Sequence, residues 1–454
     1  MGRRVAIVGG GLAGITAALD CAAGGAEVSL LEVRPRLGGA AYSFERDGLY
    51  LDNGQHVFLR CCVAYRALLG RLGSERRVHI QPRLEIPVLK PGSAPVVLRR
   101  SSLPAPLHLA AALARYRHIP LSQRAAAARA ALALARLQAD GHGAEEQTLG
   151  AWLAARGQSP ATVAALWDLI ALPTLNLPAD EASLALGAFV FRTGLLSRAD
   201  AGDIGFHDRP LSETIGDPAL RALAQAGVDV RLGWRVARLT RSGAGFEVHG
   251  GSEELGADAV IVALPHARAA TLLEALAAPL ARRVAALEVS PIINLHVVYD
   301  RHVCELAFAA AVGTPVQYVF DRTEAAGAPA GCQCLAVSLS GAQREMAMSV
   351  DGLRERYLPA LAQLFPRAGE ARVERFVVTR EHAATFRPAP GAGALRPGPR
   401  TAVAGLYLAG AWTDTGWPAT LESAVMSGHA AASAALQELS LDSRAAGASA
   451  VGAR

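Results

Sequence analysis

The feature that most constrains this chain is an apolar run near its start that leads into a spaced set of glycines. Residues 5–8 fit a buried parallel strand, and the pattern Gly-x-Gly-x-x-Gly over 9–14 then opens a helix predicted to reach residue 23. In such a turn the glycines allow a tight bend, close approach of a pyrophosphate, and close packing of helix on strand. Free amides at the helix start face the phosphates. The chain is thus predicted to begin with a dinucleotide-binding unit, whose contacts are Gly9, Gly11, Leu12, Ala13 and Gly14.

The next segment makes this prediction more specific. A second strand over 27–31 ends at Glu32, at about the distance expected for a contact with a ribose hydroxyl. Two arginines then supply positive charge, and a glycine pair again allows close backbone approach. An ordinary glycine-rich loop is the alternative interpretation. The further contacts predicted here are Glu32, Val33, Arg34, Arg36, Gly38, Gly39 and Ala40.

Composition excludes several classes of protein. The net charge is +5 and the basic residues are dispersed, so we expect no nucleic-acid partner. No uninterrupted apolar segment reaches the roughly 18 residues that suggest a membrane span. The first strand starts at Val5, which leaves no room for a cleavable signal peptide and favours the cytoplasm. The six cysteines form neither a spaced zinc pattern nor a Cys-x-x-Cys pair, so no metal site is predicted.

A short polar turn follows two strands predicted over 41–45 and 49–52. It comprises Asp52, Asn53, Gly54, Gln55 and His56, and it lies between two apolar runs. One interpretation is a capped turn before a helix over 64–72. The other is a functional segment.

At this point the residues resemble the FAD-dependent oxidoreductases of the amine oxidase and phytoene desaturase type. The dinucleotide unit, Glu32 and the Arg36-x-Gly38-Gly39 motif carry the likeness, although Ala40 stands where the family usually has arginine. Within that family the turn at 52–56 looks most like the hydroxysqualene dehydroxylases of hopanoid biosynthesis, which favours its functional interpretation. The resemblance implies an α/β fold with a Rossmann-like, doubly wound FAD-binding domain of the glutathione reductase type and a discontinuous α+β substrate domain. It also implies flavin contacts at Asn53, Gly54 and Gln55.

A second glycine-ended strand near the C-terminus extends the resemblance to the other end of the chain. Residues 406–410 read as a buried strand, and Pro418 suits the first turn of a helix running to about residue 436. In the family this helix start faces the flavin pyrimidine edge and stabilises the reduced, anionic form. Ala411 replaces the usual acidic residue, and Asp414 is the candidate to take over its contact. No cysteine follows Cys334, so a cysteinyl flavin linkage is excluded here and non-covalent FAD is expected. The contacts implied are Gly410, Asp414, Trp417, Pro418, Ala419 and Thr420.

The segments between these motifs predict the domain organisation. We expect an FAD-binding domain over 1–75, 205–289 and 386–440, a substrate domain over 76–204 and 290–385, and a flexible tail over 441–454. The resemblance places Val236 beside the adenine and Ala263 beside the dinucleotide, although a generic alternating strand explains Val236 equally well.

The first part of the substrate domain, residues 76–200, is expected to be a long helical tract. Helices predicted over 107–117 and 124–137 carry interspersed arginines, and they either pack on the core, which we favour, or lie on a membrane surface. Two prolines predict a bend over 167–178, where Asn176 either hydrogen-bonds substrate or caps the next helix.

The resemblance implies removal of an allylic hydroxyl from an apolar isoprenoid, converting hydroxysqualene to squalene. Hydroxide leaves poorly, so an acid must protonate it before reduced flavin delivers hydride; the electron donor is left open. We expect His56 to be the proton donor, with Asp52 either the acid itself or the group that keeps His56 protonated. The catalytic candidates are His56, Asp52, Asn53 and Gln55. A carotenoid-type desaturase is the alternative, and an amine oxidase or a non-catalytic flavin-binding protein is less favoured.

Overall fold

A five-stranded parallel sheet forms the centre of the first part of the fold. Its strands are β1 (Arg4–Val8), β2 (Glu27–Glu32), β10 (Asp229–Leu232), β14 (Ala259–Val262) and β20 (Leu406–Leu408). They are arranged in the order β10-β2-β1-β14-β20 in the computed structural model, which describes residues 3–137 and 142–451. Because parallel strands are covered on both faces, they form nearly continuous apolar runs, and β14 is buried throughout.

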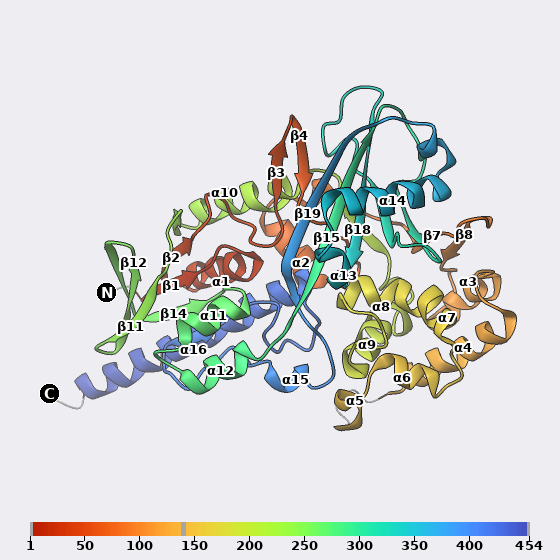
Figure 1. Ribbon diagram of the computed structural model, residues 1–454. Coiled ribbons are helices and arrows are strands. Elements are labelled where there is room, and N and C mark those ends of the chain that lie inside the picture. The colour runs from red at the N-terminus through yellow and green to blue at the C-terminus, as the bar shows by residue number, and fades with distance from the viewer. Residues whose placement is uncertain (1–2, 138–141, 452–454) are drawn as a thin grey trace.

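Helices cover one face of this sheet and a second, small sheet covers the other (Figure 1). On the first face lie α1 (Leu12–Ala23), α2 (Val63–Arg71), α10 (Asp217–Gln225) and α16 (Leu421–Val451). On the second face lie β11 (Arg238–Ser242), β12 (Gly245–Gly250), β13 (Glu253–Ala257), α11 (His266–Leu273) and α12 (Ala278–Ala285). Alternate side chains of β1 pack on opposite faces of the sheet: Ile7 packs on the side of α1, and Ala6 packs on the side of the small sheet.

A seven-stranded mixed sheet dominates the second part of the fold. Its order is β19 (Val373–Phe386), β15 (Val289–Tyr299), β18 (Gln333–Ser340), β17 (Tyr318–Asp321), β16 (Phe308–Ala311), β7 (Glu85–Leu89) and β8 (Val96–Arg99). One face packs on α14 (Val350–Leu364), through alternate residues of β15 such as Leu295 and Val297. The opposite face turns toward the hairpin β3 (Ser43–Arg46) and β4 (Leu49–Asp52), as Figure 1 shows.

Short elements complete this second part. A three-stranded sheet is made of β5 (Phe58–Leu59), β9 (Ile204–His207) and β6 (Val78–Ile80). The helices are α3 (Ala110–Arg115), α4 (Leu121–Ala135), α5 (His142–Glu146), α6 (Leu149–Ala154), α7 (Pro160–Thr162), α8 (Asp168–Leu175), α9 (Leu184–Phe191), α13 (Gln343–Met346) and α15 (Ala392–Leu395). Single turns of 3₁₀ helix are η1 (Glu75–Arg77), η2 (Leu107–Leu109) and η6 (Pro366–Gly369), and wider π turns are η3 (Val163–Trp167), η4 (Arg192–Leu196) and η5 (Ser212–Gly216).

The α/β fold class is confirmed, but three local predictions need correction. The tract over 76–200 is not wholly helical, because β6, β7 and β8 lie in it and β7 pairs with β16, far away in the sequence. The closing helix begins at Leu421 rather than at Pro418, since the Thr420 hydroxyl caps it by accepting the Ser423 amide at 3.1 Å. The same helix continues to Val451, across most of the expected tail, and residues 452–454 lie outside the described part.

Asn176 has a role different from the two expected ones. It ends α8 in a left-handed conformation, with φ of 55°. Its amide nitrogen donates to the Ser290 carbonyl at 2.9 Å, and its amide oxygen accepts the Gly341 amide at 2.7 Å. It therefore fastens α8 to the large sheet. The division of the whole chain into two domains remains our proposal, supported by the two separate sheets.

Candidate active site

The carboxyl ends of β1, β14 and β20 meet at one edge of the parallel sheet, where this class of fold binds its ligand. Gly9 has a φ of +111°, and a Cβ there would lie 2.5 Å from the Ala263 carbonyl oxygen. A Cβ on Gly14 would lie 1.9 Å from the Gly9 oxygen. Only glycine fits either position, so the close turn expected from the sequence is formed.

The second glycine pair lies directly against this turn. Gly38 and Gly11 form a parallel bridge, and a Cβ on Gly39, which has a φ of +59°, would lie 2.7 Å from the Gly11 Cα. Gly11 itself precedes α1 without a side-chain cap from the described residues, so the first amides of α1, at Leu12 and Ala13, are available to a phosphate. These residues form a cradle that fits a pyrophosphate.

Glu32 ends β2 beside the cradle and is 8% exposed. One carboxylate oxygen accepts the Gly10 amide at 2.6 Å, and the other accepts the Arg34 amide at 2.8 Å. The Glu32 carbonyl accepts the amide of Trp234, which places the half-buried Val236 two residues from this strand end. The acidic residue and Val236 are therefore brought to the same side of the sheet.

The residues after Glu32 differ in exposure. The side chains of Val33, Arg34 and Ala40 are exposed. Arg36 is partly buried, its guanidinium stacks 3.6 Å from the centroid of the Tyr42 ring, and it donates to the Gly39 carbonyl at 3.4 Å. Burial lowers the pKa of Arg36.

The loop between β20 and α16 closes the site from the other end of the chain. Gly410 has a φ of +142°, and the Trp412 indole packs against it and donates to the Leu264 carbonyl at 2.8 Å. Arg396, only 4% exposed, donates to the carbonyls of Thr413 at 2.6 Å and Trp417 at 2.7 Å. This buried cation, which we did not identify from the sequence, fixes the shape of the loop.

Two residues of this loop that were expected to contact the flavin, Asp414 and Trp417, differ from each other in exposure. Asp414 is exposed, and its carboxylate accepts the Gly416 amide at 3.2 Å within the same loop. Trp417 is half-buried and packs edge-on against Phe189, with ring centroids 5.1 Å apart. Pro418, Ala419 and the cap Thr420 lead from there into α16.

Asp52 is the anchor of the polar turn. It is 6% exposed, and its carboxylate accepts hydrogen bonds from the Ser43 hydroxyl at 2.6 Å, the Leu211 amide at 3.0 Å and the Arg322 guanidinium at 2.9 Å. The structure pairs the Asp52 carboxylate with Arg322, and the charge of Asp52 also raises the pKa of His56, so its role in keeping His56 protonated stays our proposal. The positive charge of Arg322 and the negative charge of Asp52 thus neutralise each other.

Asn53 is also committed to structural bonds. Its amide nitrogen donates to the Ala40 carbonyl at 2.8 Å and to Glu381 at 2.9 Å, and its amide oxygen accepts the Tyr42 amide at 3.2 Å. These bonds join the turn to β19, because Glu381 lies on that strand.

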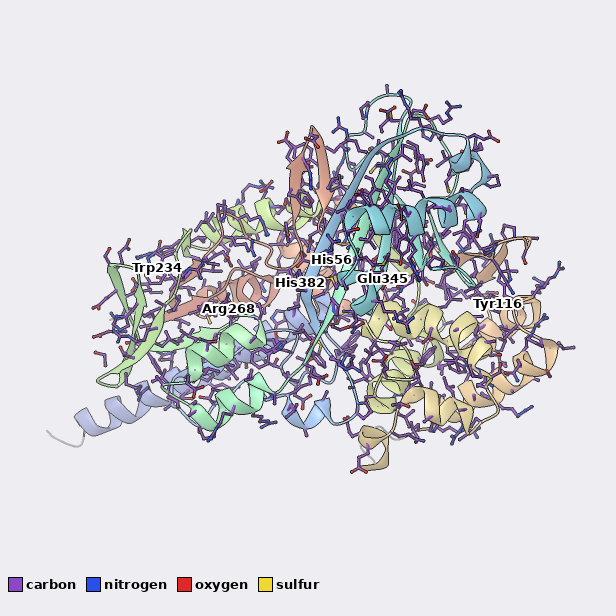
Figure 2. The ribbon with its side chains drawn as sticks, in the orientation of Figure 1. His56, Tyr116, Trp234, Arg268, Glu345 and His382 are labelled. Carbon is purple, nitrogen blue, oxygen red and sulfur yellow. The ribbon has the colours of Figure 1, made fainter. Side chains whose placement is uncertain are left out.

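His56 lies where the two parts of the fold meet, and Figure 2 shows it close to β19. A small pocket there is lined by Asp52, Gln55, His56, Val57, Phe206, His207, Leu211, Phe320 and Arg322. Burial lowers the pKa of His56, and the charges of Asp52 and Glu381 oppose that effect. His207 accepts or shares a hydrogen bond with the Tyr65 hydroxyl at 2.7 Å, and burial lowers its pKa to about 3.

Some buried polar atoms around the turn find no hydrogen-bond partner within the described residues. They are the amide nitrogen of Gln55 and the amide oxygen of Asn294, while the two ring nitrogens of His296 make no hydrogen bond of standard geometry and lie near the Asp52 backbone, which raises the pKa of His296. Each unmet bond costs about 1–3 kcal/mol. Such groups require an explanation, and a bound molecule supplies one.

Sequence reasoning missed Arg322, His207, Glu381, Asn294 and His296. Only Asn294 and His296 left a usable signal, since they lie two residues apart within a strand that is apolar except for these two and Ser290. Two polar residues on one face of a buried strand are unusual. Arg322, His207 and Glu381 reach the turn from three separate segments, and no local pattern connects them.

The comparisons with known proteins agree with this geometry. A model of the flavin containing amine oxidoreductases matches residues 12–436. The chain belongs to this family. The predicted FAD cofactor and oxidoreductase class are thereby confirmed, and the glycine cradle is the part of the structure that fits the cofactor's pyrophosphate.

Individual relatives align with this chain over almost its whole length. A hydroxysqualene dehydroxylase of Rhodopseudomonas palustris is 30% identical, covering 95% of this chain and 98% of its own. A 15-cis-phytoene desaturase of Narcissus pseudonarcissus is 24% identical, covering 97% and 80%. The solved structure of cyclohexylamine oxidase from Brevibacterium oxydans superposes with a TM-score of 0.74 at 18% identity, covering 97% and 100%, and shows the fold.

Two further observations concern what the site and surface hold. Among residues 3–137 and 142–451, no group of three or more His, Cys, Asp or Glu side chains is placed to hold a metal ion. None of the helices in the described part of the chain combines the length and the apolar character needed to cross a membrane.

Proposed function

We propose that this FAD-dependent oxidoreductase reductively removes the hydroxyl group of hydroxysqualene to give squalene, within hopanoid biosynthesis. The observation that carries the proposal is the pocket in which an imidazole, His56, lies beside the aromatic rings of Phe206 and Phe320. A hydrocarbon with one hydroxyl group needs this combination of a proton donor and an apolar wall. Three relatives named hydroxysqualene dehydroxylase, at 27–30% identity over nearly full length, support it.

The chain's own residues divide the work as follows. His56 donates a proton to the hydroxyl oxygen, so that water rather than hydroxide leaves. Phe206 and Phe320 keep bulk water away and present ring faces to the allylic cation. The Asp52–Arg322 pair holds the turn that carries His56. FAD, bound in the glycine cradle, supplies the hydride when it is reduced.

Anaerobic reoxidation of the reduced flavoprotein tests this proposal. Addition of hydroxysqualene is expected to reoxidise the reduced flavin and yield squalene, whereas an amine added to the oxidised protein is expected to leave the flavin oxidised. His56→Ala is expected to slow this step by about 10²–10⁴-fold, the usual contribution of a general acid. His382→Ala is the matched control, because His382 is exposed on β19. Full turnover by His56→Ala would remove His56 from the mechanism.

A carotenoid-type desaturase is the second candidate, favoured by the likeness to phytoene desaturase over 97% of this chain. Here the oxidised flavin would accept hydride from a polyene precursor. Adding phytoene to the oxidised protein, and following bleaching of the flavin absorbance, distinguishes the two reactions. Bleaching by phytoene together with no reaction of hydroxysqualene would replace our first proposal.

We also propose a cytoplasmic protein that binds reversibly to a membrane surface and holds FAD non-covalently. Leu103, Leu107 and Leu121 are 51%, 56% and 72% exposed. Leu103 and Leu107 lie just before α3 in the sequence and Leu121 begins α4, and the nearby Arg115 and Arg117 are exposed too. Figure 1 shows α3 and α4 at one end of the molecule. Apolar side chains flanked by arginines suit an anionic lipid surface.

Two measurements check these points. Cosedimentation with anionic vesicles is expected to weaken in Leu107→Glu and Leu121→Glu, and not in Leu220→Glu, whose leucine is exposed on α10. Acid precipitation is expected to release all of the flavin into solution.

A further inference from the structure

The long strand β15 carries two polar side chains toward the polar turn. Asn294 is 0% exposed and His296 is 1% exposed, and both lie on the face of β15 opposite to Leu295 and Val297. The Asn294 amide nitrogen donates to the Asn53 carbonyl at 3.0 Å. The two residues are therefore fixed against the turn that carries His56.

Most of the buried polar atoms beside the turn that lack a standard hydrogen bond belong to Asn294 and His296. The Asn294 amide oxygen and the Gln55 amide nitrogen, on the turn itself, find no partner among the described residues. The two His296 ring nitrogens make no hydrogen bond of standard geometry there, and their one polar neighbour of note is the Asp52 backbone, which raises the pKa of His296. Buried polar groups are normally paired, so a partner that is not part of the described chain is indicated.

The position of Gly54 relates this pair to the proposed proton donor. A Cβ built on Gly54 would lie 3.4 Å from the Asn294 amide nitrogen and 3.4 Å from the His56 Nε2. The Asn294 side chain and the His56 ring thus flank one point, and that point adjoins the pocket lined by Gln55 and His56.

The chemistry of the group that fits is restricted. Asn294 and Gln55 are neutral, and burial lowers the pKa of His296 to about 4, so the imidazole is neutral near pH 7 and offers one donor and one acceptor. The nearby charges of Asp52 and Arg322 already satisfy each other. The remaining carboxylate near His56, Glu381, accepts hydrogen bonds from Tyr42 and from Asn53, so it is also engaged within the protein. A hydroxyl group both donates and accepts.

We propose that Asn294, His296 and Gln55 form the binding site for the hydroxyl group of the substrate, beside His56. This inference rests on the proposed dehydroxylation and names the residues that select an isoprenoid alcohol over the hydrocarbon of the same skeleton. Asn294 and His296 hold the hydroxyl oxygen in position, and the proton comes from His56. They set specificity, because a hydrocarbon leaves all of these polar atoms unpaired.

The test uses the FAD-loaded protein in its oxidised state, which binds without turnover. Hydroxysqualene and squalene are titrated separately, and binding is followed by the flavin fluorescence. The wild type is expected to bind the alcohol at least tenfold more tightly. Asn294→Leu and His296→Phe are each expected to reduce this preference below threefold, with squalene affinity within twofold of wild type. His108→Phe is the matched control, since His108 is equally buried and also has an unpartnered ring nitrogen but lies on η2.

A second set of variants keeps the inference testable if those substitutions disturb folding. His296→Asn retains hydrogen-bonding groups and is expected to retain part of the preference. Gly54→Ala places a methyl group at ordinary contact distance between His56 and Asn294, and is expected to weaken alcohol binding more than squalene binding.

The outcomes separate this inference from the proposed function. Equal binding of both compounds by the wild type, or an unchanged preference in Asn294→Leu and His296→Phe, would overturn the hydroxyl site. A preference that depends on these residues, together with no reoxidation of the reduced flavin by hydroxysqualene, would keep the site and refute the dehydroxylation.

Discussion

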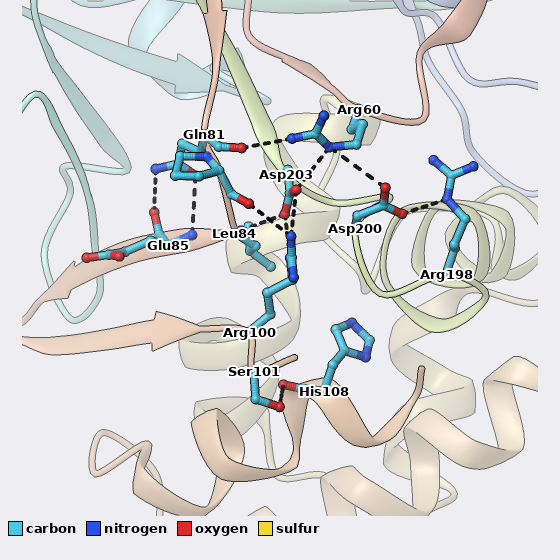
Figure 3. Close-up of polar contacts among 11 residues, drawn as sticks. Arg60, Gln81, Leu84, Glu85, Arg100, Ser101, His108, Arg198, Asp200 and Asp203 are labelled. Atoms are coloured by element: carbon cyan, nitrogen blue, oxygen red, sulfur yellow. Dashed lines mark hydrogen bonds and ion pairs between the residues drawn. The ribbon is translucent and has the colours of Figure 1, made fainter. Parts of the chain in front are cut away.

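Replacing Asp203 by asparagine tests how the second part of the fold is held together. Asp203 is 0% exposed and immediately precedes β9 (Figure 3). Its carboxylate accepts from Arg100 at 2.6 and 2.8 Å, from Arg60 at 3.0 Å and from the Leu84 amide at 2.7 Å. These partners follow β8, follow β5 and precede β7, so one buried anion joins four segments.

The expected magnitude follows from what asparagine cannot supply. One amide oxygen replaces two carboxylate oxygens, and the amide NH₂ faces donors. The side chains of Arg100 and Arg60 are 14% and 27% exposed. Arg100 would be left partly buried without a counter-charge, and Arg60 would keep only its longer contact with Asp200, at 4.0 Å. Removing one partner of a buried ion pair typically costs about 3–5 kcal/mol. We expect the free energy of unfolding to fall by that amount.

Urea unfolding of the FAD-loaded protein, followed by circular dichroism at fixed FAD concentration, measures this loss. Asp200→Asn is the comparison variant. Asp200 is 44% exposed and pairs with the exposed Arg198 and, at 4.0 Å, with Arg60, so its loss should cost about 0–1 kcal/mol. If Asp203→Asn and Asp200→Asn unfold within about 1 kcal/mol of each other, the cluster does not hold the fold as we argue.

A pH series gives an independent check on the same residue. Burial raises the pKa of Asp203, but the hydrogen bonds from Arg100 and Arg60 outweigh it, so the folded pKa lies below the ordinary value. The stabilisation is therefore present above pH of about 3.9 and is lost as pH falls through the lower folded pKa. The difference between wild type and variant should shrink only in strong acid.

Three further predictions address the site. Burial lowers the pKa values of His207 and His296 to about 3 and about 4, so acid favours the unfolded chain, in which both histidines take up protons. Between pH 6.5 and 5.5 each histidine should therefore lower the free energy of unfolding by about 1 kcal/mol. His207→Phe should reduce this dependence on pH, as measured by urea titrations. Gly39→Ala should weaken FAD binding, measured by flavin fluorescence, because its Cβ would lie 2.7 Å from a backbone atom of the cradle, whereas Gly48→Ala, in open space, should bind normally. The rate of flavin reoxidation by hydroxysqualene should fall as pH rises, with an apparent pKa below 6.5, because burial lowers the pKa of His56; a rate that rises with pH would contradict its role as proton donor.

The parallel sheet and the hairpin after it were predictable because their signals are local. Strands covered on both faces form continuous apolar runs, which is how β1 and β20 were identified. The hairpin of β3 and β4 has positive φ at Asp47 and Gly48, and Asp-Gly is the sequence that tolerates this turn.

The rest depended on contacts between distant segments. β7 and β8 lie in an alanine- and leucine-rich tract, and the pairing of Val88 with Ala310 determines that β7 is a strand. The turn at 52–56 was identified from its sequence, but its partners were not, since Arg322 and Glu381 reach it from far along the chain. Such contacts between side chains far apart in the sequence leave no periodic pattern from which they could be predicted.

The candidate cofactor site brings together segments that are far apart in the sequence, since the cradle lies within the first forty residues and the closing loop lies between β20 and α16. During synthesis the N-terminal strand and helix therefore leave the ribosome long before α16 exists to pack on α1. A nascent or prematurely terminated chain has the glycine cradle but no closing loop, so we expect it to retain no flavin. Flavin content thus reports whether a molecule has been completed, and truncated products should remain colourless.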